Sequence, residues 1–309
     1  MIQGTRVSAC QQIVNAIKGG ISVNYEKKQL SAGLYFVATP IGAARDITLR
    51  GLDILASADV IAAEDTRTAK RLMEIHGIPL GDRPVISYHD HSGDTVRERL
   101  MKYIADGKSV AYVSEAGTPL VADPGYVLGR AAIEAGFLVI GAPGPSAVIA
   151  ALTVAGLPTD RFFFAGFPPN AKGARRKFIE EYADVPGTLV FYESPKRIQG
   201  MLGDLAQILG GERQAAVCRE LTKRFEEVSR GSLNELNAAF SDRSVKGEIV
   251  VLVDRARGVQ VSDQSMEEAL REALKSMRIK DAATAVSEAL GMPRRKVYQA
   301  ALELRKDGE

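Results

Sequence analysis

Two short segments carry charged side chains directly after runs of apolar residues. YESPKR, at 192–197, follows the run TLVF, and CRELTKRFEE, at 218–227, follows QAAV. A carboxylate can accept a proton and a basic side chain can stabilise negative charge, so both segments contain the residue types of general acid–base catalysis. Alternating charges at a strand edge can also form plain ion pairs or a solvated face. We predict that the catalytic side chains are among Glu193, Lys196, Arg219, Glu220 and Lys223.

A third segment, SEAGTP at 114–119, ends the apolar run SVAYV. The chain has no G-x-G-x-x-G after its first apolar run and no Walker sequence, the glycine-rich cradles that bind nucleotide phosphates. A nucleoside without phosphates, such as S-adenosylmethionine, instead needs carboxylates for its hydroxyl and ammonium groups and small residues that let the main chain approach. Gly117, Gly144 and Ala147 would permit this close approach of the main chain. Structural turns use the same residue types, so composition alone leaves both interpretations open.

These segments lie within a regular alternation of apolar runs and amphipathic helical patterns. From 34 to 142, strand-like runs such as LYFVAT and SVAYV alternate with helical stretches. This order predicts an α/β fold with a mostly parallel sheet covered on both faces, which binds ligands beyond the carboxyl ends of its strands. From about Leu157 to Asp254 the strand-like runs outnumber the helical ones, which predicts a separate mixed sheet.

The composition is typical of a soluble globular protein. A length of 309 residues favours two domains. No apolar run is long enough to span a bilayer, and the N-terminus shows no secretory signal pattern. The two cysteines, Cys10 and Cys218, form no disulfide framework, so a cytoplasmic location is expected. Because the net charge is only +2, a polyanionic partner must meet locally clustered basic side chains.

The chain is expected to divide into four parts. Residues 1–32 are polar and glycine-punctuated and are expected to form a flexible extension. An N-terminal α/β domain is predicted at 33–155, a C-terminal α/β domain at 156–256, and a small helical tail at 265–309.

The tail has the pattern of a helix-turn-helix. Its apolar side is predicted to comprise Val286, Leu290, Val297, Ala301 and Leu304. The second helix of this pattern opens with Arg294, Arg295 and Lys296, which favours contact with RNA. A plain three-helix packing or dimerisation element explains the same pattern equally well.

Eight motifs, taken in order, resemble one family. The chain from about 33 to 254 resembles the bacterial 16S ribosomal RNA (cytidine-2′-O)-methyltransferases of the tetrapyrrole-methylase superfamily, and the tail resembles the appendage of the same enzymes. No single motif is decisive, but their order across two domains is specific. The motifs are FVATPIGAARDITLRGLDIL, AAEDTRTAKRLM, SYHDH, VSEAGTPLVADPG, GAPGPSAVIAAL, FAGFPP, VFYESPKRI and CRELTKRFEEV.

The resemblance implies two α/β domains of the class III methyltransferase type with S-adenosylmethionine in the cleft between them. It implies that the methyl donor is contacted by Pro40, Ile41, Glu115, Gly117, Thr118, Pro119, Ser146 and Ala147, and less strongly by Tyr192 and Gly247. Glu115 departs from the family, which usually has aspartate at this position. The longer side chain moves the carboxylate outward by one methylene, which puts its direct contact with the donor in doubt.

The resemblance also indicates residues that bind the substrate. In AEDTRT, Asp65 or Thr66 alone would be read as a helix N-cap, but the family motif favours substrate contact by Glu64, Asp65 and Arg67. His89 belongs to HDH, which lacks the ligands of a complete zinc site, so no metal is predicted; the resemblance instead favours a loop contact of His89 with RNA or with a partner subunit. The basic run at 172–177, with Arg175 and Arg176, is expected to meet RNA phosphates, although such runs are commonly plain solvated surface.

The predicted function is methyl transfer from S-adenosylmethionine to the ribose 2′-hydroxyl of a cytidine in 16S ribosomal RNA of the small subunit. A homodimer and no membrane association are expected by resemblance. Two alternatives stay open on the sequence: a C-methyltransferase of tetrapyrrole precursors, which the superfamily includes, and a non-enzymatic regulator that binds nucleic acid through the tail.

Overall fold

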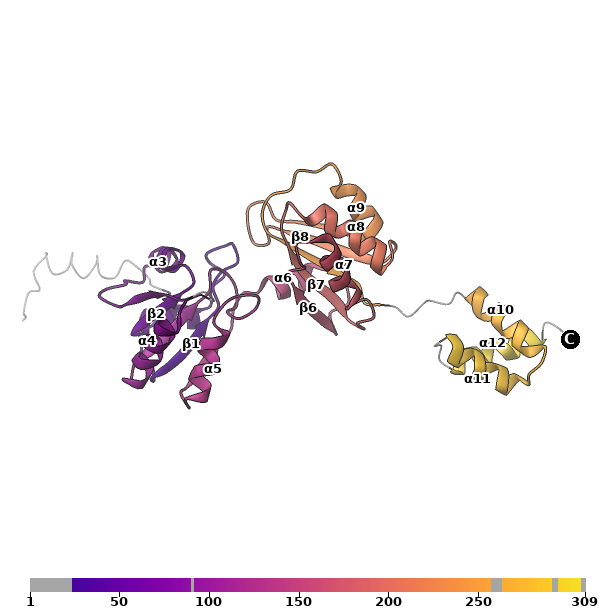
Figure 1. The fold of residues 1–309 in the computed structure, drawn as a ribbon, viewed down its shortest axis with the longest axis horizontal. Helices are drawn as coiled ribbons and strands as arrows, with labels where there is room; N and C mark the ends of the chain where they lie inside the picture. Colours follow the sequence, from indigo (N-terminus) through magenta and orange to yellow (C-terminus); the bar gives the residue numbers. More distant parts are fainter. Residues whose placement is uncertain (1–23, 90–91, 257–262, 291–293, 307–309) are drawn as a thin grey trace, which may run out of the picture. The chain divides into compact units, whose positions relative to one another are not determined.

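The computed structural model describes residues 24–89, 92–256, 263–290 and 294–306, and Figure 1 shows its fold. The chain divides into two units, one made of residues up to 254 except 184–187, and the other of the remaining residues. The strands are β1 (Gly33–Val37), β2 (Val60–Ala63), β3 (Val85–Ser87), β4 (Ser109–Val113), β5 (Val139–Ala142), β6 (Phe162–Gly166), β7 (Thr188–Glu193), β8 (Gln214–Arg219), β9 (Glu227–Ser232) and β10 (Ile249–Val253). The helices are α2 (Leu49–Ser57), α3 (Thr66–Ile75), α4 (Asp94–Ala105), α5 (Tyr126–Glu134), α6 (Ala147–Ala155), α7 (Lys172–Glu180), α8 (Ile198–Leu209), α9 (Leu233–Phe240), α10 (Asp263–Leu274), α11 (Ile279–Leu290) and α12 (Arg294–Lys306).

The first sheet has the strand order β3-β2-β4-β1-β5, and every neighbouring pair is parallel. The prediction of a parallel sheet is therefore confirmed. The chain leaves β1 toward β2 on one side and leaves β4 toward β5 on the other. The connections that follow these two adjacent strands run in opposite directions over opposite faces of the sheet, and this kind of switch point is where open α/β sheets bind ligands.

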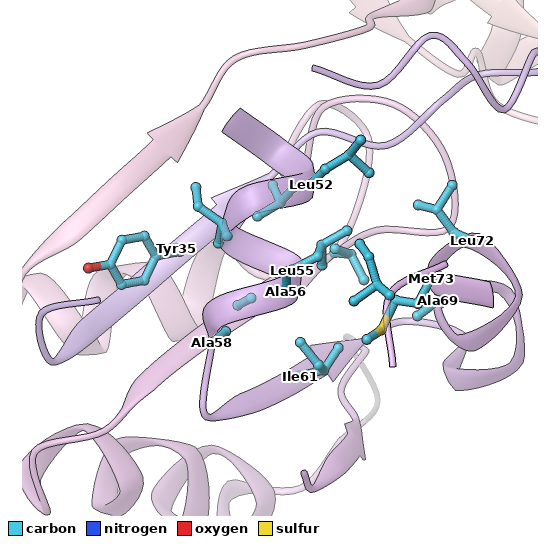
Figure 2. Close-up of a cluster of buried hydrophobic side chains, with 14 of the residues drawn as sticks. Tyr35, Leu52, Leu55, Ala56, Ala58, Ile61, Ala69, Leu72 and Met73 are labelled. Carbon is cyan, nitrogen blue, oxygen red and sulfur yellow. The ribbon is translucent and has the colours of Figure 1, made fainter. Parts of the chain in front are cut away.

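Helices cover both faces of the first sheet. Alternate side chains of each strand point to opposite faces, and apolar side chains on both faces are buried under helices. Tyr35 and Val37 belong to a buried cluster with side chains of α2 and α3, and Figure 2 shows Leu55, Ile61 and Met73 within that cluster. A second cluster unites other strand residues with apolar side chains of α4 and α5. The layered core thus holds the carboxyl ends of β1 and β4 in place.

The second sheet is mixed, as predicted, with the order β6-β7-β10-β8-β9. Within this sheet, β6 and β7 pair in parallel, whereas the pairs of β10 with β7 and β8, and of β8 with β9, are antiparallel. Helices α7, α8 and α9 pack side by side, and α9 contacts β8 and β9. In Figure 1 these three helices lie along the second sheet.

Helix α6 does not belong to the domain to which the expected boundary at 155/156 assigns it. Val148 and Leu152 of α6 pack with Val190 of β7 and Ala216 of β8 in one buried cluster. The reason is that α6 is apolar around most of its circumference, so its periodicity does not reveal which sheet it covers. The two α/β domains are therefore joined by this shared helix as well as by the chain.

Residues 24–32 also differ from the expectation of a flexible extension. The hydroxyl of Tyr25 donates to the carbonyl of Gly77 over 3.1 Å, and the amide of Lys28 donates to Ser57 Oγ over 2.9 Å. Tyr25 and Leu30 pack against the cluster beneath α2 and α3. This segment is bound to the first domain, and residues 1–23 lie outside the described residues.

The tail is a small bundle in which α10, α11 and α12 contact one another. Its core contains Met266, Leu270, Ala283, Val286, Val297 and Ala301, with Leu290 and Leu304 partly buried against it. The predicted apolar side is confirmed. Arg294, Arg295 and Lys296 are exposed in the first turn of α12.

Candidate functional site

A cavity of about 650 Å³ lies within the unit that ends at Asp254, a volume in the usual range of small-molecule sites. Its walls are the loops after β1, β4 and β5 together with the ends of β7 and β8 and the start of β10. Of the residues predicted to contact the methyl donor, those that line it are Pro40, Ile41, Glu115, Gly117, Thr118, Ser146, Ala147, Tyr192 and Gly247. Pro119 is buried behind this wall.

The loops after β1 and β4 are joined at the switch point. Thr39 and Gly117 exchange both backbone hydrogen bonds, with N···O distances of 2.9 and 3.0 Å. Gly117 has φ +82°, and a Cβ there would lie 3.3 Å from Ile41 Cγ2. Glycine is therefore favoured here both by the left-handed backbone and by the close approach of Ile41. The SEAGTP segment forms one wall of the cavity, and its contact with the methyl donor stays a prediction.

The loop that ends β5 is tied to the same wall. The hydroxyl of Thr118 donates to the carbonyl of Pro145 over 2.8 Å. Ser146 is the N-cap of α6, and no side-chain hydrogen bond caps this helix. Ser146 and Ala147, at the start of α6, both line the cavity.

Two loops at the cavity hold non-glycine residues at positive φ. Leu120 and Ala122 have φ 73° and 59°, and Glu220 and Thr222 have φ 51° and 63°. Such backbone is uncommon for residues with a side chain, and it concentrates at functional sites where the surrounding structure enforces it. The Thr222 hydroxyl accepts a hydrogen bond from the amide of Ala43 over 3.1 Å, which links the loop after β8 to the loop after β1.

Carboxylates dominate the charged side chains of the cavity wall. Glu64 Oε2 accepts from the amide of Glu115 over 3.1 Å, so the two loops that carry these residues are held together. The charged lining residues are Glu64, Glu115, Asp123, Glu193, Glu248 and Lys223. An acidic cavity favours a cationic ligand with hydroxyl and ammonium groups and disfavours a phosphate. This chemistry fits S-adenosylmethionine.

Glu193 ends β7 and is almost fully buried, with 3% of its surface exposed. Its Oε1 accepts from the Ser194 amide over 2.7 Å and lies 3.2 Å from Nε of Arg197. Its Oε2 has no hydrogen-bond partner in the described part of the chain. Burial raises the pKa of Glu193 above its ordinary value, against the opposing effects of Ser194, Arg197 and Arg175. A carboxylate in this state is a suitable proton acceptor.

Lys223 faces the cavity from the loop after β8. Its ammonium group donates to Glu220 and Glu248, with both distances at 2.8 Å. Burial opposes protonation, but these carboxylates outweigh it and raise the pKa of Lys223, so the side chain is a fixed cation. A Cβ on Gly247, which has φ +92°, would lie 2.3 Å from Cδ of Glu220. Glycine at this position makes room for the carboxylate that positions Lys223.

The other catalytic candidates do not line the cavity. Arg219 pairs with Glu227 over 3.0 Å and donates to the carbonyl of Lys246. Lys196 is exposed on the turn before α8. Glu220 holds two lining residues, since its Oε1 accepts from the Lys223 ammonium over 2.8 Å and from the Glu248 amide over 3.1 Å. These three residues follow apolar strands, as the sequence indicated, but a strand end does not reveal which way each side chain points.

The residues predicted to bind the substrate do not lie at one site. Glu64 lines the cavity, whereas Asp65 is the N-cap of α3 and accepts from the Arg67 amide over 2.7 Å. Hydrogen bonds from Arg67 lower the pKa of Asp65 to about 2. Arg67, with a side chain 90% exposed, lines a neighbouring cavity of about 380 Å³ together with Arg71. The N-cap interpretation of Asp65 is thus correct.

The prediction that Arg175 contacts RNA phosphates is wrong, because its side chain is buried. The run at 172–177 begins the amphipathic helix α7, which turns Arg175 inward. There the guanidinium pairs with Asp204 of α8 at 2.6 Å, and both side chains are buried. Arg176 is partly exposed. His89 is exposed and lines neither cavity.

Several lining residues escaped the sequence analysis: Asp123, Phe167, Glu248 and Leu221. The first two lie in motifs that carry the family resemblance, VSEAGTPLVADPG and FAGFPP, and Glu248 follows Gly247. Their motif membership was the available signal. Within the described residues, no group of His, Cys, Asp and Glu could hold a metal ion, and no helix has the length and hydropathy to cross a membrane.

Comparisons with known proteins agree with this geometry. The profile of the Tetrapyrrole (Corrin/Porphyrin) Methylases matches residues 33–237, and that of the RsmI C-terminal HTH domain matches residues 260–305. A relative from Mesorhizobium japonicum, named Ribosomal RNA small subunit methyltransferase I, is 43% identical over 90% of this chain and 94% of its own. One of the same name from Halalkalibacterium halodurans is 39% identical over 89% and 96%.

Solved structures resemble the fold at lower identity. The methyltransferase CobJ matches with a TM-score of 0.56 and 20% identity over 75% of this chain and 98% of its own. A cobalt precorrin-4 methyltransferase of cobalamin biosynthesis matches with a TM-score of 0.54 and 18% identity over 72% and 94%. At this identity the likeness establishes the fold alone.

Proposed function

Since this chain belongs to the tetrapyrrole methylase family, we propose that it transfers a methyl group from S-adenosylmethionine to the ribose 2′-hydroxyl of a cytidine in 16S ribosomal RNA. The observation that carries the proposal is the extent of the likeness to relatives named Ribosomal RNA small subunit methyltransferase I, which covers about nine tenths of the chain. The predicted family, fold class and enzyme class are confirmed.

Neither alternative from the sequence is favoured. The likeness to enzymes of corrin synthesis is limited to the fold, at 18–20% identity, so it does not support a tetrapyrrole acceptor. A non-enzymatic regulator does not need the acidic cavity and its fixed lysine, and relatives that are similar over nearly the whole length are named methyltransferases.

The side chains and loops of the cavity wall suit the chemical groups of the methyl donor. When bound, S-adenosylmethionine supplies a methyl group activated by a sulfonium. The carboxylates of Glu64, Glu115 and Asp123 suit its ammonium and hydroxyl groups, and the loops around Gly117 and Ala147 let the main chain come close. Positioning of the ribose oxygen should contribute much of the rate.

For the acceptor, we assign Glu193 and Lys223 complementary roles. A ribose hydroxyl is a weak nucleophile, so a base that removes its proton in the transition state helps the reaction. The Oε2 of Glu193 has no hydrogen-bond partner among the described residues and can accept that proton once the substrate opens the wall around it, since the side chain is otherwise fully buried. The Lys223 ammonium, held between Glu220 and Glu248, can stabilise the negative charge that develops on the oxygen.

The function is tested by incubating the purified protein with labelled methyl donor and either small ribosomal subunits or naked 16S RNA. Nucleoside mass spectrometry of the RNA should detect 2′-O-methylcytidine. Label in a base or in another nucleoside contradicts the proposed acceptor, and label only in an added porphyrinogen contradicts the RNA substrate. The reaction is expected to take place in the cytoplasm.

The tail should supply RNA affinity. Replacing Arg294, Arg295 and Lys296 by alanine should weaken RNA binding by roughly tenfold or more at physiological salt and flatten its salt dependence, because these exposed cations can contact phosphates. Donor affinity should not change. The matched control removes the same charge from exposed positions elsewhere in the tail, Arg271, Lys275 and Lys280. Equal RNA affinity of the two variants would assign the basic turn another role, such as dimerisation.

We also propose that the protein is a homodimer, as the family resemblance implies. Apolar side chains on α5 support a protein interface, since Tyr126 is 62% exposed and Ile133 64%. Light scattering on the purified chain should give twice the 33.2 kDa mass of one copy. A mass of one copy at micromolar concentration excludes a stable dimer.

A further inference from the structure

Phe167 is an exposed aromatic residue that lines the cavity. The residue is 58% exposed, yet it lines the cavity beside Tyr192 and Glu193. A large apolar side chain left this open contributes little to folding. Where such a ring borders a site in an RNA-modifying enzyme, it offers a face on which a base can stack.

The backbone before Phe167 is shaped to aim this ring. The register between β6 and β7 shifts between Phe164 and Gly166, which is the mark of a bulge. Gly166 has φ +73°, a conformation that glycine adopts readily. Bulges next to active sites redirect the side chains that follow them, and here the residue that follows is Phe167.

The segment that carries Phe167 is held by the same arginine that approaches Glu193. Arg197 Nη2 donates to the carbonyls of Pro168 and Pro169, over 2.5 and 3.1 Å, and Nη1 donates to Asn170. Nε of Arg197 lies 3.2 Å from Oε1 of Glu193. One guanidinium therefore ties the position of the ring to the position of the proposed proton acceptor.

Tyr192 supports the ring from behind. Its ring meets that of Phe167 edge to face at 5.3 Å and that of Phe164 at 4.8 Å. Tyr192 is itself partly buried against the core beneath the cavity. Phe167 is thus fixed on one side and open on the other.

We propose that the open face of Phe167 stacks on the base of the acceptor nucleotide and so positions its ribose beside Glu193 and Lys223. The inference rests on the proposed function. It follows from the charge of the wall, because carboxylates such as Glu64, Asp123 and Glu248 repel phosphates. The RNA backbone must stay outside, so the nucleotide has to be gripped by its neutral base. A base taken out of its stack is commonly held against aromatic side chains.

The test compares Phe167→Ala, Phe167→Leu and Phe167→Trp with wild type. Phe167→Ala should lower kcat/KM for ribosomal RNA by about 10- to 100-fold, the usual worth of one stacked base. Phe167→Leu, which keeps apolar bulk without the aromatic face, should recover little, and Phe167→Trp should recover most of the activity. The donor Kd, measured by calorimetry, should stay within about twofold of wild type, since the ring is assigned to the acceptor.

The matched control is Phe162→Ala, which removes another exposed phenylalanine, at the start of the strand β6 that Phe167 follows. Phe162 is 45% exposed and lines neither cavity, so kcat/KM should be unchanged. Unchanged kcat/KM in Phe167→Ala overturns the inference, as does a donor Kd weakened as much as kcat/KM. An equal loss in Phe162→Ala also overturns it. If the wild-type protein methylates no ribosomal RNA, both the proposed function and this inference are overturned. If the wild type is active and Phe167→Ala has the same kcat/KM, the inference alone is overturned.

Discussion

Replacing Glu193 by glutamine should lower kcat for RNA methylation by about 10²- to 10⁴-fold, the range that a well-positioned general base contributes. Glutamine keeps the size of the side chain and a carbonyl oxygen that can still accept from the Ser194 amide. It cannot take up the proton of a ribose hydroxyl. Single-turnover kinetics with saturating donor measures the effect on the chemical step, and calorimetry should show unchanged donor binding.

The pH dependence gives a second measure of the same role. The pKa of Glu193 is raised by burial, so the carboxylate is protonated at pH values where an ordinary glutamate is ionised. The wild-type rate should therefore rise with pH through this elevated pKa, and the Glu193→Gln variant should lose that limb of the profile. The contribution of Glu193 to the free energy of unfolding changes in the opposite direction with pH. Folding holds the proton more tightly than the unfolded chain does, so this group's contribution to stability falls as pH rises from the unfolded to the folded pKa.

Glu180→Gln provides the matched control, because Glu180 is exposed on α7 and lines neither cavity. Its kcat and pH profile should equal those of wild type. If Glu193→Gln keeps full activity, another group accepts the proton, and Glu193 serves only to hold Ser194 and Arg197. If donor affinity falls together with kcat, the substitution has changed the donor site instead of the chemical step.

Replacing Arg175 by methionine should lower the free energy of unfolding by about 3–5 kcal/mol, the usual cost of removing one partner from a buried ion pair. The guanidinium donates to Asp204 through Nε at 2.8 Å and lies 2.6 Å away through Nη2. Both side chains are less than a tenth exposed. Methionine fills similar volume, so the main loss is the uncompensated charge of Asp204. Urea unfolding followed by circular dichroism measures the change.

The double variant Arg175→Met/Asp204→Leu separates the ion pair from the packing around it. Removing both charges leaves no unpaired ion, and such replacements are often neutral or stabilising, so most of the lost stability should return. If the double variant is as unstable as the single one, the loss of stability comes from the packing of α7 against α8.

The Arg175→Met variant should also shift the rising limb of the pH profile of methylation to higher pH. The Arg175 charge lowers the pKa of Glu193, so its removal raises that pKa further.

Much of the architecture is determined by the sequence alone. Alternating strand-like and amphipathic segments specified the parallel first sheet and the mixed second sheet, because burial on one or both faces leaves a local pattern. The small and turn-forming residues of SEAGTP at a strand end are visible in the sequence, but only the family resemblance indicated that this segment is a wall of the methyl-donor site. The apolar side of the tail followed from helical spacing, and the family followed from the order of the motifs.

The tertiary structure decided what depends on partners distant in sequence. Helix α6 is apolar on most sides, so only packing assigns it to the second sheet. Arg175 became a buried ion pair because Asp204 lies opposite, 29 residues further along the chain. Glu193 and Lys223 converge on the cavity while Lys196 and Arg219 do not, and the β6 bulge aims Phe167 at the site. Local sequence specifies which residues can do chemistry, but the direction of a side chain depends on the long-range packing of the elements that carry it.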